Sequence, residues 1–436
     1  MSDRSRGWLW SVLAIAGCAE DAPPSPRLRV SDDLGVLTEQ LRRAGSVDPG
    51  IDIDALRDEA RRRLFASSMD DTQATYAAAS YFVDGLKKGH GGVFNYNRLL
   101  GVAASCPSDL PKLSSKNGFG VCLAPLGEEL VVTFAAADNA LSLRAGEIVT
   151  RVGGGASLDE LASIPYCGSV YPSDAGRRQV AAWAALGLLP AGTELAIRAL
   201  DGGARTVTLP APSSILTDCS DVFARPRTAS PAMTVRPDGI RVVRVGGFLW
   251  NDDEEAMRSD VTSVAIEAGE AELVIWDLRG NSGGLTEPAE TVARFLPGAA
   301  RVAAEPYLAC SYRGTDWSPA SPAAAPSHGI PRRAAVLVDG ACYSACSHLV
   351  RMARAAGALL VGTEDNATYS TSYESFGLGD VNVVIDMALC RDARTGEVAE
   401  GRPTAMDVAV TYDPTDLAAG RDTVLEAAAL ALLDGK

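Results

Sequence analysis

The sequence predicts an α/β fold: a C-terminal α/β core preceded by an N-terminal helical segment and an inserted β-rich domain. Three observations predict it. Apolar residues between 51 and 67 recur at the spacing of an amphipathic helix. Short β-rich runs alternate with turns from about 118 to 211. From about 231 onward, apolar runs of strand length alternate with helical patterns, which is typical of strands covered by helices on both faces.

The N-terminus has the pattern of an export signal. Residues 1–6 contain two arginines, and the apolar stretch at 7–17 is too short to span a bilayer. That stretch ends in Ile15-Ala16-Gly17-Cys18, which resembles the bacterial lipobox. We therefore expect a signal peptide at 1–17, lipidation of Cys18, and a Pro-rich linker at 18–30 that tethers the protein to a periplasmic or outer membrane face of the cell envelope. A plain signal peptide that happens to contain Cys18 is the alternative.

Composition and charge exclude several classes of function. The formal charge of −15 argues against a nucleic-acid partner, because no basic patch is available to neutralise phosphates. No CxxC pair is present, so we expect no metal site, and nothing indicates a cofactor. In an exported chain the eight cysteines other than Cys18 permit disulfides, although spacing does not reveal their pairing. These cysteines are Cys106, Cys122, Cys167, Cys219, Cys310, Cys342, Cys346 and Cys390.

Residues 31–117 are predicted to be a helical region. One helix lies within 51–67, and a second runs from Thr75 to Leu86, capped by Asp70 or Asp71. Two lysines and Gly89 end the second helix, as the helix dipole and a left-handed cap prefer. His90 follows immediately, on a turn among glycines.

Residues 118–211 are predicted to form the inserted β-domain. Its last two strands are joined by Asp201-Gly202-Gly203, a hairpin signal. The phrase RAGEIVTRVGG at 144–154 resembles a segment of PDZ domains, with Glu147 in place of their usual Asp. The resemblance implies a module that binds peptide termini by strand addition, and a generic small β-domain is the alternative.

Residues 212–436 are predicted to form the α/β core. Six runs have strand character and three stretches, 254–268, 287–295 and 344–356, have helical character. The predicted strands are GIRVVRVGGF, AELVIWDL, AAVLVDG, GALLVG, VNVVIDMAL and DVAVTY.

Two segments of the core carry the residue types of a catalytic site. A buried strand runs into the Gly-rich turn DLRGNSGG at 277–284, where paired glycines allow backbone N–H groups to approach a ligand closely. A second strand ends before Ser344, which opens a helix whose dipole favours developing negative charge. Taken alone, a serine in that place is most often an N-cap.

Together these segments resemble the tail-specific (carboxy-terminal processing) serine protease superfamily, which carries DLRxNxGG followed by a nucleophile turn. The segments EGRPTAMDVAV at 400–410 and AGRDTVLEAA at 419–428 also resemble the end of that superfamily's domain. The resemblance implies a crotonase/ClpP-like α/β protease core with an inserted PDZ-like domain, and a polypeptide substrate. It also implies that Ser344 is the nucleophile and that the N–H of Ala345, with one from Gly283 or Gly284, forms the oxyanion hole.

The base of the reaction has to be a histidine if Ser344 is catalytic. The superfamily's Ser–Lys branch is excluded, because lysines occur only at 87, 88, 112, 116 and 436, and Thr368 stands where that lysine would be. The tricorn-like branch carries a histidine in an N-terminal DGH turn, which His90 matches with Lys88 in place of the Asp. This resemblance implies that His90 is the base and that a carboxylate, approximately matched by Glu400, orients it.

One rival histidine and two rival functions stay open at this stage. His328 lies in a Pro/Ala/Ser-rich loop and is expected to be structural. His348 lies four residues after Ser344 on the same helical face, so a Ser344–His348 pair is the rival. The turn reads CYSACS rather than SASASE, with Tyr343 before the serine and Ser347 at the usual acidic position. A non-catalytic relative that binds peptide or an apolar ligand is therefore one alternative to a serine endopeptidase. An envelope scaffold that recruits partners through the PDZ-like domain is another.

Overall fold

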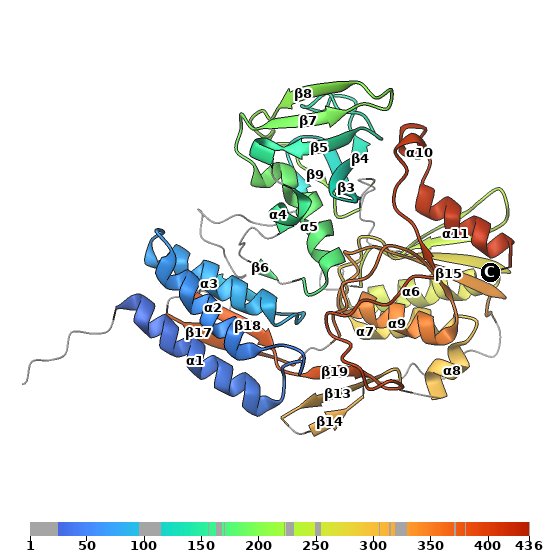
Figure 1. Ribbon diagram of the computed structural model, residues 1–436. Helices are drawn as coiled ribbons and strands as arrows, with labels where there is room; N and C mark the ends of the chain where they lie inside the picture. The colour runs from blue at the N-terminus through green and yellow to red at the C-terminus, as the bar shows by residue number, and fades with distance from the viewer. Residues whose placement is uncertain are drawn as a thin grey trace, which may run out of the picture.

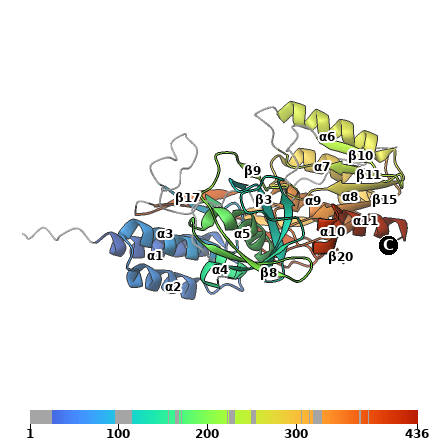
Figure 2. The same cartoon turned by 90° about the horizontal axis from the view of Figure 1, so that it is seen from above.

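The computed structural model places the elements in three groups, shown in Figure 1: N-terminal helices over a small sheet, an inserted β-domain, and an α/β core. Seen from above in Figure 2, the inserted domain lies over the junction between the N-terminal helices and the core. The structure describes residues 25–95, 115–155, 157–162, 168–169, 171–221, 223, 231–248, 254–304, 306–313, 315–318, 329–369, 372–379 and 381–435. The predicted signal peptide, Cys18, His328, Cys106 and Cys167 lie outside these residues.

Three N-terminal helices cover a four-stranded antiparallel sheet. The helices are α1 (Pro26–Ala44), α2 (Ile53–Ala66) and α3 (Asp71–Gly85). The strands, in sheet order, are β17 (Tyr373–Leu378), β18 (Val381–Asp386), β1 (Gly92–Asn95) and β6 (Gly168–Ser169). Apolar side chains such as Leu34, Phe82 and Val383 form one buried cluster between the helices and the sheet. The turn that carries His90 follows α3 and is therefore packed against strands from the far end of the chain.

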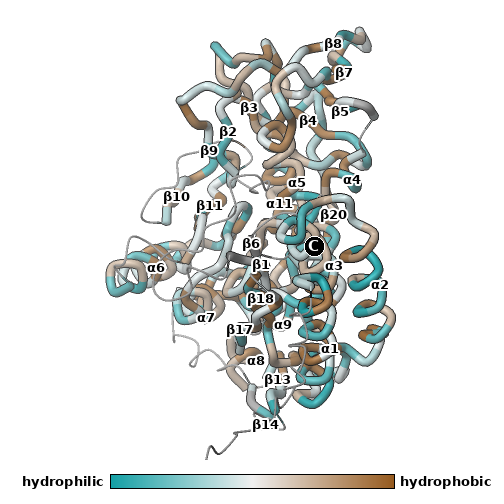
Figure 3. Tube along the Cα trace, turned by 90° about the vertical axis from the view of Figure 1, so that its left-hand side faces the viewer, coloured by the Kyte–Doolittle hydropathy of each residue, from teal (hydrophilic) through white to brown (hydrophobic). Residues whose placement is uncertain are grey.

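The inserted domain is a five-stranded antiparallel sheet packed on a helix. The strands, in sheet order, are β3 (Val121–Leu126), β4 (Glu129–Ala135), β5 (Ile148–Val152), β7 (Glu194–Arg198) and β8 (Ala204–Thr208). A single 3-10 turn (Gly153–Gly155) and the short helix α4 (Leu158–Ala162) precede α5 (Asp174–Leu188). The predicted hairpin at 201–203 joins β7 to β8. Helix α5 was not predicted; it is hydrophobic over most of its length (Figure 3) because both the sheet and the core bury it.

The core is a six-stranded sheet, parallel except for its first hairpin. Its strands, in sheet order, are β10 (Ala232–Val235), β11 (Arg241–Arg244), β12 (Leu273–Asp277), β15 (Arg333–Val338), β16 (Leu359–Gly362) and β20 (Val408–Ala409). Alternate side chains of β12 point to opposite faces: Trp276 joins one apolar cluster and Ile275 another. The predicted α/β core is confirmed.

Helices cover both faces of the core sheet. One cluster packs α6 (Glu254–Gly269), α7 (Thr286–Arg294), α8 (Ala299–Ala304) and α9 (Ala345–Ala356) on one face. On the other face α11 (Thr423–Leu433) packs beside α10 (Pro414–Ala418) and the inserted sheet. A small sheet of β14 (Thr315–Trp317), β13 (Leu308–Tyr312) and β19 (Leu389–Asp392), and a two-stranded pairing of β2 (Lys116–Asn117) with β9 (Thr217–Asp218), complete the described elements.

Three disulfides link described cysteines: Cys122–Cys219, Cys310–Cys390 and Cys342–Cys346. The first ties the inserted domain to the segment that leads into the core, and the second joins β13 to β19. The third closes the short turn around Ser344. Spacing alone did not reveal these pairings, because a disulfide depends on which Cα atoms the fold brings together.

Two features of the predicted layout differ in the structure. Helix α1 begins at Pro26, inside the segment 18–30 predicted as a linker, because Ser25 caps it by accepting the Leu28 N–H and Pro26 suits a first helical position. The predicted strand VNVVIDMAL contributes β18, which pairs with β1 rather than with the parallel sheet. The strand itself was predicted correctly, but its pairing partner depends on the packing of the whole chain. In the described part of the chain, no helix has the length and apolar character that crossing a membrane requires.

Candidate active site

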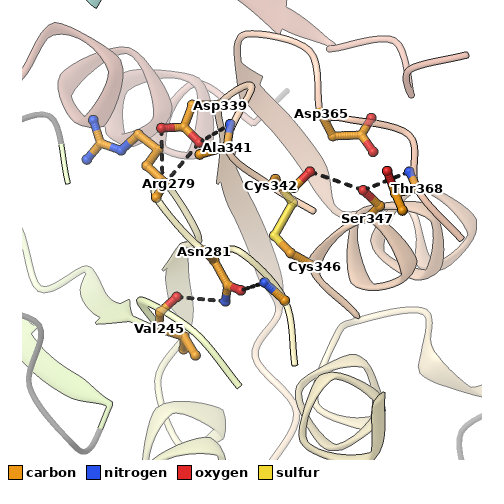
Figure 4. The surroundings of a disulfide bond; sticks show 12 residues. Val245, Arg279, Asn281, Asp339, Ala341, Cys342, Cys346, Ser347, Asp365 and Thr368 are labelled. Carbon is orange, nitrogen blue, oxygen red and sulfur yellow. Dashed lines mark hydrogen bonds between the residues drawn. A yellow bond between two sulfur atoms is a disulfide. The ribbon is translucent and has the colours of Figure 1, made fainter. Parts of the chain in front are cut away.

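The two predicted turns meet at the carboxyl ends of β12 and β15, which are adjacent parallel strands. The Asp339 carboxylate joins them, because it accepts the N–H of Gly280 at 3.1 Å and that of Ala341 at 3.1 Å. Burial raises the pKa of Asp339 to about 7, although these N–H groups oppose the rise. Figure 4 shows Asp339 and Ala341 above the disulfide, with Arg279 beside them.

The DLRGNSGG turn is held by two buried polar side chains. The Arg279 guanidinium donates to both oxygens of Asp277 and both oxygens of Asp422, at 2.7–2.8 Å. Since Asp422 caps α11, this fork fixes the turn to the C-terminal helix. Asn281 donates to the Val245 carbonyl at 2.9 Å, as Figure 4 shows. It also accepts the Gly283 N–H at 2.8 Å.

Ser344 occupies the N-cap position of α9 but does not act as a cap. Its side chain makes no capping hydrogen bond, and its Oγ lies 2.8 Å from Nε2 of His90. The backbone of Ser344 has φ 56° and ψ −122°, an unusual conformation for a non-glycine residue. A strained conformation costs about 1–3 kcal/mol and persists only where the surroundings enforce it. The structure therefore brings together the predicted nucleophile and base, which lie 254 residues apart in the sequence.

The turn that carries His90 fits closely against the core. His90 itself has φ 53°, and its N–H donates to the Tyr343 hydroxyl. A Cβ added to Gly89 would lie 2.0 Å from Cγ2 of Thr368, so only glycine allows this approach. Thr368 stands where the sequence comparison placed the missing lysine, and here it packs beneath the histidine turn.

Several charged residues near the turn that carries His90 are buried. Lys88 is almost fully buried, and its Nζ donates to the Ala388 carbonyl at 2.5 Å. Burial lowers the pKa of Lys88, and the carboxylates of Asp386 and Glu400 oppose the fall. Glu400 is also buried and accepts the Tyr369 N–H, at 3.0 and 3.2 Å from its two oxygens. The predicted carboxylate thus lies among the residues of the site, close enough to act electrostatically on Lys88.

The three predicted oxyanion residues surround Ser344 but differ in what their N–H groups do. A Cβ on Gly283 would lie 2.7 Å from Cβ of Ser344 and 3.0 Å from the Ala345 nitrogen, so this glycine touches the serine turn. Its N–H is taken by Asn281. Within the described residues, the N–H groups of Gly284 and Ala345 make no hydrogen bond. Gly284 is therefore better suited than Gly283 to pair with Ala345 as a donor.

The rival pair Ser344–His348 is not formed. His348 is buried one turn into α9, where its Nε2 lies 2.6 Å from the Tyr369 carbonyl and its Nδ1 lies 2.9 Å from the Tyr307 hydroxyl. A carbonyl only accepts, so Nε2 carries the proton and Nδ1 accepts from Tyr307. Burial lowers the pKa of His348 to about 4, which keeps the ring neutral. His348 is a structural residue of the core.

Sequence reasoning left several parts of this site open. Cys342 and Cys346 flank Ser344 and were expected to form structural bridges of unknown pairing; the structure pairs them with each other around the serine turn. The Ser347 hydroxyl, at the superfamily's usual acidic position, donates to the Cys342 carbonyl at 3.1 Å and accepts the Thr368 N–H at 3.4 Å (Figure 4). Among the described residues, no cluster of histidine, cysteine and acidic side chains could hold a metal ion.

Comparison with known proteins identifies the core. Residues 240–402, which include the DLRGNSGG turn, Ser344 and Glu400, match peptidase family S41. The chain carries a peptidase family S41 domain. This match confirms the resemblance to the tail-specific protease superfamily and to serine-type peptidases, whereas the branch within the superfamily stays a prediction. No curated protein matches the chain.

Solved structures share the fold at low sequence identity. Mature CPAF matches with a TM-score of 0.65 and 13% identity, covering 94% of this chain and 99% of CPAF. Mature CPAF complexed with lactacystin matches with a TM-score of 0.64 and 13% identity, covering 94% of this chain and 100% of the other. These matches cover far more of the chain than the S41 domain, so the fold is shared over most of its length.

Proposed function

We propose that the protein is a serine endopeptidase of the Ser–His type, which cleaves unfolded polypeptide or C-terminal segments through an acyl-enzyme at Ser344. The observation that carries the proposal is the 2.8 Å contact between Ser344 Oγ and His90 Nε2. That distance is within hydrogen-bond reach, so the imidazole can take the hydroxyl proton directly. The S41 match supports peptide-bond hydrolysis as the reaction.

The reaction follows from the donors and acceptors of the site. His90 Nε2 accepts the Ser344 proton while Oγ forms a bond to the carbonyl carbon of the substrate. The N–H groups of Gly284 and Ala345 stabilise the resulting oxyanion. When the carbon–nitrogen bond breaks, the imidazolium returns the proton to the leaving amine. A water molecule then hydrolyses the acyl-enzyme, with His90 again taking and returning the proton.

The proposed role of Glu400 follows from the protonation of the His90 ring during the reaction. Because Nε2 must accept the serine proton, Nδ1 carries the hydrogen in the resting base, and the imidazolium formed during the reaction has to be stabilised. Glu400 approximately matches the acidic residue of the tricorn-like branch, and its electrostatic interaction with Lys88 and Tyr343 supports this assignment. We propose that it stabilises the charged form of His90.

The inserted domain is proposed to present the polypeptide. Strand β3 is at the edge of its sheet, where an extended peptide could add as a further strand. The N-terminal end of β3 is already covered, since Asn117 donates to the Val121 carbonyl and Cys122 is bonded to Cys219.

We also propose that the protein is exported and held in the cell envelope through a lipidated Cys18.

A fluorophosphonate probe tests the assignment of nucleophile and base. The wild-type protein should be labelled on Ser344, Ser344→Ala should abolish labelling, and His90→Gln should slow it by about 10²–10⁴-fold. His348→Gln is the control histidine and should keep the wild-type rate. Labelling that survives Ser344→Ala contradicts the nucleophile, and an unchanged rate in His90→Gln contradicts the base. An unlabelled wild-type protein that still binds peptide would instead favour the non-catalytic alternative.

A further inference from the structure

Tyr343, the residue immediately before Ser344, contacts the proposed base in two ways. Its hydroxyl accepts the backbone N–H of His90. Its ring lies edge-on to the imidazole, with ring centroids 5.0 Å apart and an interplanar angle of 69°. One side chain therefore touches both the backbone and the ring of a residue that belongs to a different layer of the fold.

Tyr343 is itself held firmly. Its N–H donates to the Asn281 carbonyl at 3.2 Å, which ties it to the DLRGNSGG turn. The Cys342–Cys346 disulfide closes the chain on either side of it. Tyr171 packs edge-on against its ring, with centroids 5.7 Å apart. These contacts restrain the Tyr343 side chain, whose hydroxyl lies against the His90 N–H.

The Tyr343 hydroxyl does not ionise over the working pH range and so keeps its hydrogen bond from the His90 N–H. Burial raises the pKa of Tyr343, and the nearby carboxylates of Glu400 and Asp386 add to the rise, so the phenol stays neutral over the working pH range. The N–H that it accepts belongs to a residue with φ 53°, a conformation that side chains disfavour. Other contacts, such as that of Lys88 with the Ala388 carbonyl, locate the turn as a whole. The Tyr343 contacts act on the last residue of the turn, whose ring must meet Ser344.

We propose that Tyr343 is a positioning residue, which holds the His90 imidazole in register with Ser344 through its hydroxyl and its ring. The inference rests on the proposed function. It explains why the residue beside the nucleophile is an aromatic with a hydroxyl, where the superfamily pattern has a small residue. The nucleophile turn then aligns its own base, because any displacement of Ser344 carries Tyr343 and His90 with it.

The experiment compares two conservative variants at two tyrosine–histidine pairs. Tyr343→Phe removes the hydroxyl that accepts the His90 N–H and keeps the ring. Tyr307→Phe likewise removes a hydroxyl and keeps the ring, here the donor to His348, which is outside the proposed mechanism. The rate of fluorophosphonate labelling is measured per active site after titration of the sites, together with kcat and KM on an unfolded protein substrate. Counting sites separates a folding defect, which lowers their number, from a positioning defect, which lowers the rate at each.

Tyr343→Phe is expected to lower the labelling rate and kcat by about tenfold with KM unchanged, because a partly buried N–H loses its acceptor and the base loses alignment. Tyr307→Phe is expected to keep the wild-type rate per site. A wild-type rate in Tyr343→Phe overturns the inference, and so does an equal loss in Tyr307→Phe or a loss confined to KM. If the wild-type protein is not labelled on Ser344 at all, the proposed function fails and this inference fails with it.

Discussion

Removing the Cys342–Cys346 disulfide should slow catalysis more than it destabilises the protein. The two buried sulfurs enclose Tyr343, Ser344 and Ala345 in a short covalent loop. A disulfide that closes a loop of about five residues restricts the open chain by about 2 kcal/mol in the chain-entropy relation. The positive φ of Ser344 costs a similar amount, about 1–3 kcal/mol. The stabilisation that the disulfide provides is therefore about equal to the backbone strain at Ser344.

The perturbation is the double variant Cys342→Ala/Cys346→Ala, since alanine avoids burying two new hydroxyl groups. Without the bridge the turn can relax toward an ordinary helix start, and about 2 kcal/mol corresponds to a loss of roughly 30-fold in rate. The hydrogen bonds that Asn281 and Ser347 make to this turn remain. We therefore expect the variant to fold. Its free energy of unfolding should change by less than the ~2 kcal/mol that the rate loss represents, because relief of the strain at Ser344 offsets the lost restriction on the unfolded chain.

The control is Cys310→Ala/Cys390→Ala, which removes the bridge between β13 and β19. This bridge spans 80 residues, so the same relation assigns it about 4–5 kcal/mol of stability. The control should therefore lose more stability and less activity than the test variant. The assay is the rate of phosphonylation per titrated site, with guanidinium unfolding on the same samples. A wild-type rate in Cys342→Ala/Cys346→Ala, or an equal rate loss in the control, would refute the reasoning.

Three further substitutions test other parts of the structure. Gly283→Ala should lower the phosphonylation rate by at least about 100-fold, because the new Cβ would lie 2.3 Å from the Tyr343 carbonyl at a φ of 84°; a variant with more than a tenth of the wild-type rate contradicts this. Arg279→Met should cost about 3–5 kcal/mol in urea unfolding, since two carboxylates lose their buried partner, and a cost below about 1 kcal/mol would exclude that role. His348 has a folded pKa of about 4 against about 6.5 unfolded, so as pH falls through this window the unfolded state takes up the proton first and stability is lost. Between pH 6.5 and 4 the free energy of unfolding should fall by about 3 kcal/mol less in His348→Asn than in the wild type. If the two proteins lose stability in parallel over this range, His348 is not the group responsible.

The inserted domain helps to support the nucleophile turn, which no local pattern indicated. Gly340 lies directly against the start of α5, where an added Cβ would be 2.4 Å from the Ala175 carbonyl. Ala341 belongs to the same buried cluster as Val180 and Trp183 of that helix. A helix that sequence reasoning overlooked thus packs against the turn that carries Ser344, and its apolar character has two causes, the inserted sheet on one side and the core on the other.

The sequence by itself indicated the superfamily and the residues that we propose for its chemistry. Strand patterns ended at Asp277 and before Ser344, the DLRGNSGG turn indicated the superfamily, and the absence of a suitable lysine left His90 as the base to be expected. These inferences depend on a few neighbouring residues, whose backbone preferences and side-chain chemistry are local properties. The S41 match and the α/β core agree with the inferences on the strands and the superfamily, and the assignment of His90 as the base stays a proposal.

Only the tertiary structure decided whether those residues could work together. The 2.8 Å contact of His90 with Ser344 closes a separation of 254 residues, and the contact of Tyr343 with His90 closes 253. The positive φ of Ser344 and the pairing of its flanking cysteines are likewise results of packing. Such contacts depend on the free energy of folding of the whole chain, because each layer of the fold positions the next. A short segment of sequence does not determine that free energy.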